Sequence, residues 1–86
     1  MIELNKNILL TSYDRDVIQE ILCRVKIPYT GIYSNHYPSA ILATKYGGLV
    51  GVDLEDTIDK IKEGYITCCC DTIDDFVKEI NESYIK

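Results

Sequence analysis

The apolar residues of this 86-residue chain fall into short runs and helical stripes that alternate along its length. The most distinct run lies near the C-terminus, where Tyr65, Ile66 and three adjacent cysteines form a segment of strand length between Gly64 and Asp71. Cysteine is among the residues most often buried. We therefore expect this strand to lie inside a sheet, covered on both faces.

An amphipathic helix is predicted directly after that strand. Asp71 or Thr72 can cap its first turn with a side-chain oxygen. Burying its apolar stripe requires a sheet or a second helix beneath it, so the rest of the predicted fold is arranged around residues 64–86. The stripe consists of Ile73, Phe76, Val77, Ile80 and Tyr84, at the spacing of one helical face.

Two further stripes predict helices earlier in the chain. In the first, Thr11 or Ser12 is the expected N-cap, with Asp14 completing a weak capping box, and Pro28 ends the helix near residue 26. The second begins at the cap Asp53 and ends at the next glycine. The apolar positions are Val17, Ile18, Ile21, Leu22 and Val25 in the first helix, and Leu54, Ile58 and Ile61 in the second.

The remaining apolar runs predict strands at residues 8–10, 29–34, 40–46 and 49–52. Gly47-Gly48 is a hairpin turn signal, so we expect the middle of the chain to form a meander of three short strands. The element order is β-α-β-β-β-α-β-α. It predicts an α+β (mixed α/β) fold with a mixed sheet and about three helices, in one domain over residues 1–86. A small two-layer sandwich is the expected architecture, and a three-layer arrangement is the alternative.

The charge of the chain is distributed unevenly. The net charge is −5; residues 1–52 carry four acids and five bases, whereas residues 53–86 carry ten acids and four bases. Negative charge disfavours direct binding to nucleic acid or to a membrane surface. A one-sided acidic surface suits a protein partner with a basic surface, although the solvation of helix faces also explains it.

The cysteines and the N-terminus bear on the compartment. No apolar run approaches the roughly 18 residues that a membrane span needs. The N-terminal segment has too short an apolar core for a secretory signal. Three adjacent cysteines fit a reducing environment, so we expect a cytoplasmic protein.

The cysteine triplet, Cys68 to Cys70, is the most unusual chemical feature of the chain. Structural zinc sites usually space their cysteines so that a loop wraps the metal, and three in a row on a strand do not. We expect these thiols to pack as small apolar side chains, with no metal site and no cofactor. Cys68 and Cys70 together with Cys23 and His36 remain an open alternative for a ligand set.

No motif for catalysis is present in the sequence. Cys23 and His36 are the only cysteine–histidine pair outside the triplet, and Cys23 lies beside an apolar stripe, where a thiolate is disfavoured. Gly47, Gly48 and Gly51 lack the lysine and hydroxyl residues of a P-loop. We therefore expect no enzymatic activity.

An unusual aromatic set points to binding instead. The chain has seven tyrosines, one phenylalanine and no tryptophan, and tyrosine suits contact surfaces because it joins a large apolar ring to a polar tip. The predicted partner-binding residues are Tyr33, His36, Tyr37 and Tyr46, with the acids Asp53, Glu55, Asp56 and Asp59 beside them.

These observations predict a small protein-interaction module that binds and inhibits or regulates another protein. Immunity, antitoxin and phage-encoded inhibitor proteins are analogous in size and charge. The alternative is a small-molecule or metal-binding sensor that uses the Cys68–Cys70 strand or the Tyr33–Tyr37 loop. Homodimerisation through a tyrosine-rich strand edge also stays open.

Overall fold

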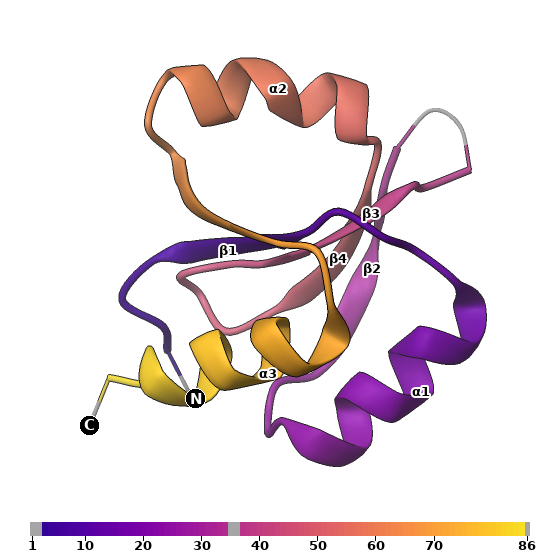
Figure 1. The fold of residues 1–86 in the computed structure, drawn as a ribbon, viewed down its shortest axis with the longest axis vertical. Coiled ribbons are helices and arrows are strands. Elements are labelled where there is room, and N and C mark those ends of the chain that lie inside the picture. The colour runs from indigo at the N-terminus through magenta and orange to yellow at the C-terminus, as the bar shows by residue number, and fades with distance from the viewer. Residues whose placement is uncertain (1–2, 35–36, 86) are drawn as a thin grey trace.

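The computed structural model of the chain describes residues 3–34 and 37–85. It contains three helices and a five-stranded mixed sheet in the predicted order (Figure 1). The strands are β1 (Asn7–Leu10), β2 (Tyr29–Tyr33), β3 (Ala40–Ala43), β4 (Leu49–Val52) and β5 (Ile66–Cys70), and the helices are α1 (Arg15–Arg24), α2 (Leu54–Lys62) and α3 (Ile73–Glu82). The predicted α+β class and element order are therefore confirmed.

The strand order across the sheet is β2-β4-β3-β1-β5. The predicted hairpin between β3 and β4 forms, with Gly47 at a φ of 79°. Its turn is not the expected pair Gly47-Gly48: the Gly47 N–H donates to the Thr44 carbonyl at 3.0 Å, so the turn spans residues 44–47 and β3 ends at Ala43. The predicted three-strand meander is wrong, because β2 pairs with β4 in parallel and not with β3. Both edges of β3 are occupied by β1 and β4, so the outer edge of β4 is where β2 can join.

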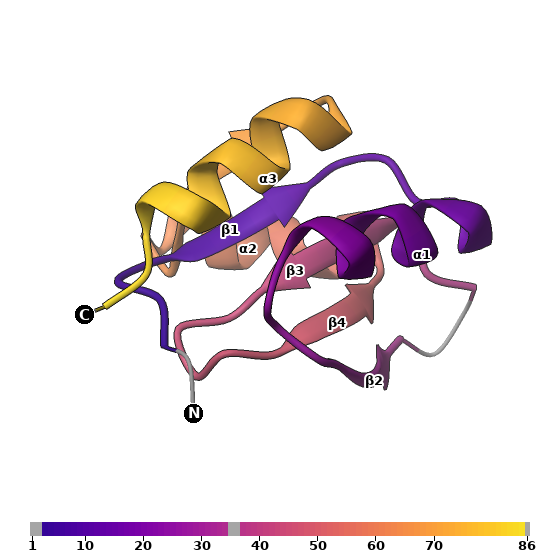
Figure 2. The same cartoon turned by 90° about the horizontal axis from the view of Figure 1, so that it is seen from below.

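The helices cover both faces of the sheet: α1 and α3 lie on one face and α2 on the other (Figures 1 and 2). The expected two-layer sandwich is therefore wrong, and the structure has the alternative arrangement of three layers. Strand pairing makes β1 parallel to β2, and β4 parallel to β5, so each pair needs a helical crossover. The crossover through α1 runs from β1 toward the β2 edge, and the crossover through α2 runs from β4 toward the β5 edge. Because both crossovers are right-handed but run in opposite directions across the sheet, their helices lie on opposite faces.

Side-chain alternation on β1 shows how the two cores form. Ile8 and Leu10 point into the larger core with Phe76 of α3 and Ile21 of α1, whereas Leu9 points into the smaller core beneath α2. These five side chains are fully buried, and Ile66 in the smaller core is almost fully buried. The unbroken apolar run of β1 therefore reflects a strand covered on both faces.

The three helix starts follow side-chain capping. Asp53 accepts a hydrogen bond from the Glu55 backbone N–H at 3.0 Å, and Thr72 accepts one from the Asp75 N–H at 3.2 Å. The predicted cap of the first helix is wrong: Asp14 is the N-cap of α1. Thr11 instead donates its hydroxyl hydrogen bond to the Asp71 carboxylate at 3.0 Å, across the ends of β1 and β5.

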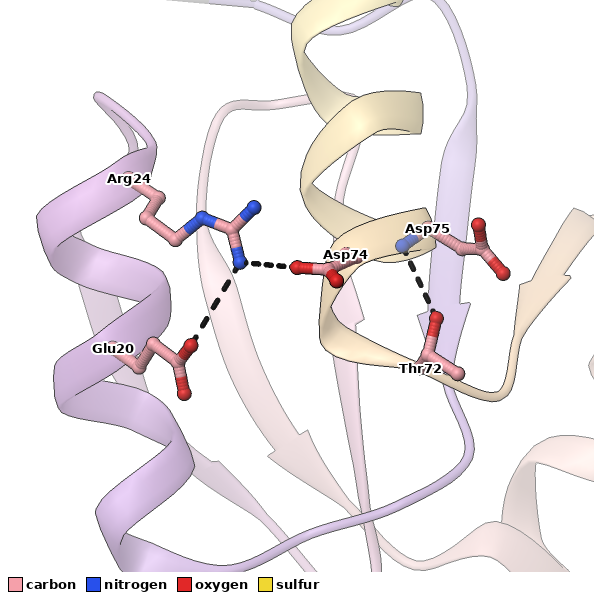
Figure 3. A network of polar contacts seen from close by, with 5 residues as sticks. All are labelled: Glu20, Arg24, Thr72, Asp74 and Asp75. Carbon is pink, nitrogen blue, oxygen red and sulfur yellow. Dashed lines mark hydrogen bonds and ion pairs between the residues drawn. The ribbon is translucent and has the colours of Figure 1, made fainter.

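A polar contact joins the two helices that share one face of the sheet. The Arg24 guanidinium at the end of α1 lies 2.7 Å from the Asp74 carboxylate of α3, and 3.8 Å from Glu20 one turn earlier (Figure 3). Asp74 is in the first turn of α3, just after its cap Thr72, so the arginine bridges the end of one helix and the start of the other.

No helix of the described residues is long and apolar enough to cross a membrane.

The position of β5 differs from the sequence-based expectation. It is an edge strand and not an internal one, with β1 as its neighbour in the sheet. Its cysteines alternate between the two faces: Cys70 is buried and Cys68 is half-buried beside the larger core, whereas Cys69 is exposed. The expectation that all three thiols pack as apolar side chains is therefore wrong for Cys69. Helices α2 and α3 pack against its two faces.

Candidate protein-interaction surface

Two exposed tyrosines flank a hollow at the β2 side of the sheet. Tyr33 at the end of β2 is 73% exposed, and Tyr46 in the β3–β4 hairpin is 83% exposed. The hollow between them has a volume of about 480 Å³ and an apolar floor that includes Val50. The other lining residues are Pro28, Thr30, Thr44, Gly47 and Gly48.

A second hollow lies between the sheet and α2, with a volume of about 220 Å³. It shares Tyr33, Thr44 and Val50 with the first, so the two hollows are parts of one depression on the same face of the sheet. We call this depression, lined by Tyr33, Thr44, Tyr46, Val50 and Asp56, the tyrosine groove. Its lining beneath α2 also includes Leu42, Val52, Thr57 and Lys60.

Charged groups of α2 stand at the groove. Asp56 lines it and also lines a more polar hollow beside the end of β2, with Ile32 and Tyr33. Lys60, one turn further along α2, lines the part beneath the helix. Within the described part of the chain neither side chain has an ion-pair partner. The groove therefore combines an apolar floor with an unpaired carboxylate and an unpaired ammonium group.

The groove stays open because α2 lies toward the β5 side of the sheet. The smaller core beneath α2 is built from Leu54 and Ile61 of the helix against Leu9 and Ile66. On the β2 side of the same face, residues of β2, of β4 and of the β3–β4 hairpin line the opening, among them Thr30, Val50 and Gly48. Gly48 brings the hairpin close to β2, since a Cβ there would lie 3.1 Å from the Thr30 side chain.

Only part of the predicted binding set comes together. Tyr33, Tyr46 and Asp56 share the groove, whereas Tyr37 lies apart from it. The Tyr37 ring meets Tyr13 edge-on at 5.6 Å between centroids, and the Arg15 guanidinium stands 5.4 Å from its centre. These contacts hold Tyr37 against the start of α1.

The remaining predicted residues have other positions. Asp53 and Glu55 form the start of α2, where capping and the helix dipole account for both acids. Asp59 is exposed on α2 and does not line the groove. His36 lies outside the described residues.

Tyr29 belongs to the cluster at Tyr37 and not to the groove. Its hydroxyl is packed near Gly51 and Pro38, since a Cβ on Gly51 would lie 2.9 Å from the tyrosine oxygen. Burial raises the pKa of Tyr29 to about 12, and the neighbouring Tyr13 adds to that increase. Tyr13, Tyr29 and Tyr37 thus form one cluster, separate from the exposed pair Tyr33 and Tyr46 at the groove.

Thr44, Val50 and Lys60 are among the groove residues that the sequence did not predict, and Ile32 lines the polar hollow beside the groove. Side-chain alternation along β4 places Val50 and Val52 on one face of the sheet, and this could have been predicted from the sequence. The sequence carries no comparable signal for how far α2 covers that face, so the opening could not be located from it.

The cysteine strand supports no metal site among the described residues. The Cys68 and Cys70 sulfurs are 4.0 Å apart, and burial raises the pKa of both thiols, to about 12 for Cys70. Beside them the Lys6 ammonium pairs with Glu79 at 2.9 Å. This hydrogen bond raises the pKa of Lys6 and lowers that of Glu79.

Thiol labelling of the folded protein is expected to distinguish the exposed cysteines from the buried one, with the half-buried Cys68 between them. Cys23 and Cys69 are exposed and should react first, whereas Cys70 should react only after unfolding, because its thiol is buried and the thiolate is the reactive form. Time-resolved mass spectrometry of the labelled peptides measures the order. Denatured protein, in which all four react together, is the control; labelling of Cys70 as fast as Cys69 would contradict the assigned burial.

The comparisons with known proteins return no match: no family model fits the chain, and no curated protein and no solved structure is significantly similar to it.

Proposed function

We propose that this chain is a protein-interaction module that binds a partner with a basic surface through the tyrosine groove, and that it inhibits or regulates that partner without catalysis of its own. The observation that carries the proposal is the pairing of two exposed tyrosines, Tyr33 and Tyr46, across an apolar hollow. Tyrosine is enriched among the residues that dominate binding energy in interfaces.

Charge supports the choice of partner. Asp56 at the groove has no ion-pair partner in residues 3–34 and 37–85, and residues 53–86 carry most of the acids of the chain. An acidic surface accelerates encounter with a basic partner and fixes its orientation. Two copies of this chain carry the same net charge of −5, which opposes self-association. A cytoplasmic location, where the four free thiols stay reduced, fits this role.

Quantitative affinity capture tests the proposal. We expect wild-type protein immobilised on beads to retain a partner from lysate of the source cells. The double variant Tyr33→Ser/Tyr46→Ser should retain at least about tenfold less of it, because it lacks two tyrosines of the kind that dominate binding energy in interfaces. Both side chains are exposed, so the fold should tolerate the change. Retention should also fall with rising salt.

The matched control is Tyr65→Ser/Ile85→Ser, which removes two exposed apolar side chains away from the groove. This control should retain the partner as the wild type does. Equal retention by the Tyr33→Ser/Tyr46→Ser variant, or no protein enriched over empty beads, would rule out the groove as the binding surface.

A further inference from the structure

Among the residues that the structure describes, no strand lies beside the outer edge of β2. In the order β2-β4-β3-β1-β5, β2 pairs only with β4, so its outer edge carries unpaired backbone N–H and C=O groups. Its sequence YTGIY contains no charged residue and no proline, two features that protect an edge strand from pairing. The irregularity in its pairing with β4 lies between Tyr29 and Gly31, so Gly31, Ile32 and Tyr33 keep a regular register.

The other sheet edge differs in its surroundings. At β5, α2 and α3 pack on the two faces of the strand. At β2, exposed apolar side chains gather instead: Ile32 is 53% exposed, Tyr33 is 73% exposed, and the tyrosine groove adjoins them. An added strand at β2 would therefore gain side-chain contacts as well as backbone hydrogen bonds.

The end of β2 provides a place for a basic side chain. The polar hollow lined by Ile32, Tyr33 and Asp56 lies there, and the Asp56 carboxylate has no ion-pair partner among the residues that the structure describes. Side chains of an added strand project alternately to the two faces of the sheet. A lysine or arginine on the α2 face can reach Asp56, and an apolar residue two positions away lies over the hollow at Thr30 and Val50.

We infer that the β2 edge binds an extended segment of the partner protein by strand addition, with a basic side chain at Asp56 and an apolar one in the tyrosine groove. This inference rests on the proposed function and specifies the partner's binding element. Backbone hydrogen bonds would supply affinity and the two side-chain positions specificity, as in other cases of strand addition.

Selection from a display library of short random peptides tests this inference directly. We expect the enriched peptides to carry a lysine or arginine two positions from an apolar residue. Their binding should weaken about tenfold or more in Ile32→Lys, which places a charged side chain on the edge strand itself. In Asp56→Asn it should weaken about fivefold, the change that corresponds to ~1 kcal/mol for an exposed ion pair.

Two matched variants serve as controls. Tyr65→Lys introduces the same charge at an exposed apolar position beside the other edge strand, and Asp59→Asn removes an exposed acid of α2 that does not line the groove. Both should bind the selected peptides as the wild type does. Hydrogen exchange should slow at the backbone amides of residues 29–33 when a peptide is bound.

Several outcomes would overturn strand addition: no enriched peptide, unchanged binding to Ile32→Lys, or exchange that slows elsewhere than β2. Concentration-dependent protection of β2 in the protein alone, with a dimer in sedimentation, would identify a second copy as the occupant and overturn it too. If capture retains a partner that the Tyr33→Ser/Tyr46→Ser variant loses, while the partner leaves β2 exchange unchanged, the proposed function stands and strand addition fails.

Discussion

Replacing Phe76 with alanine is expected to lower the free energy of unfolding by about 3–5 kcal/mol. Phe76 is fully buried in the larger core, where α3 meets β1 and α1. The change removes most of an aromatic ring from a domain whose total stability is of the order of 5–15 kcal/mol. A loss of that size leaves a marginally folded protein.

Urea unfolding followed by circular dichroism measures the effect. Ile58→Ala is the matched control, because Ile58 is an apolar helix residue that is exposed on α2. It should change the free energy of unfolding by no more than about 0.5 kcal/mol. A Phe76→Ala variant as stable as Ile58→Ala would contradict the placement of α3 on the larger core.

Replacing Gly51 with alanine is expected to cost about 1–3 kcal/mol through overpacking. A Cβ at this position of β4 would lie 2.9 Å from the Tyr29 hydroxyl oxygen and 3.2 Å from Pro38. Distances this short require the tyrosine and the proline to move. Glycine is therefore needed at position 51, where the Tyr29 ring packs against β4.

A double-mutant cycle with Tyr29→Phe identifies the cause. Phenylalanine lacks the oxygen that makes the shortest contact. In the Tyr29→Phe background the destabilisation by Gly51→Ala should therefore be smaller by at least about 0.5 kcal/mol. The residual cost comes from Pro38. Additive effects of the two substitutions would show that the hydroxyl does not cause the strain.

Local sequence signals predicted the elements well. Capping by Asp53 and Thr72 and the apolar stripe through Phe76 act within a few residues of each other, and the structure has them. Gly47-Gly48 correctly indicated a hairpin, although its turn spans residues 44–47. They depend on hydrogen bonds and side-chain periodicity that neighbouring residues determine.

Sheet order and layering could not be read in the same way. The parallel pairing of β2 with β4 depends on which edges β1 and β3 leave open, and the face of α2 depends on the direction of its crossover. These are properties of the whole chain. The two-layer sandwich and the meander were wrong for this reason, and so was the internal position of the cysteine strand.

The candidate surface was predicted in part. Tyr33, Tyr46 and Asp56 meet at the groove although they come from β2, the hairpin and α2. Tyr37 has the same composition signal, yet Tyr13 and Arg15 hold it elsewhere. Exposure in an open groove depends on where α2 stops covering the sheet, and a single sequence does not encode that in any local pattern.

An NMR titration tests whether the proposed partner binds at the tyrosine groove. The partner recovered by affinity capture is added to ¹⁵N-labelled protein, and the shifts of the backbone amides are mapped on the fold. We predict that the largest changes fall on Ile32, Tyr33, Tyr46, Gly48 and Asp56. Changes centred on β5 and α3, with these amides unmoved, would contradict the account.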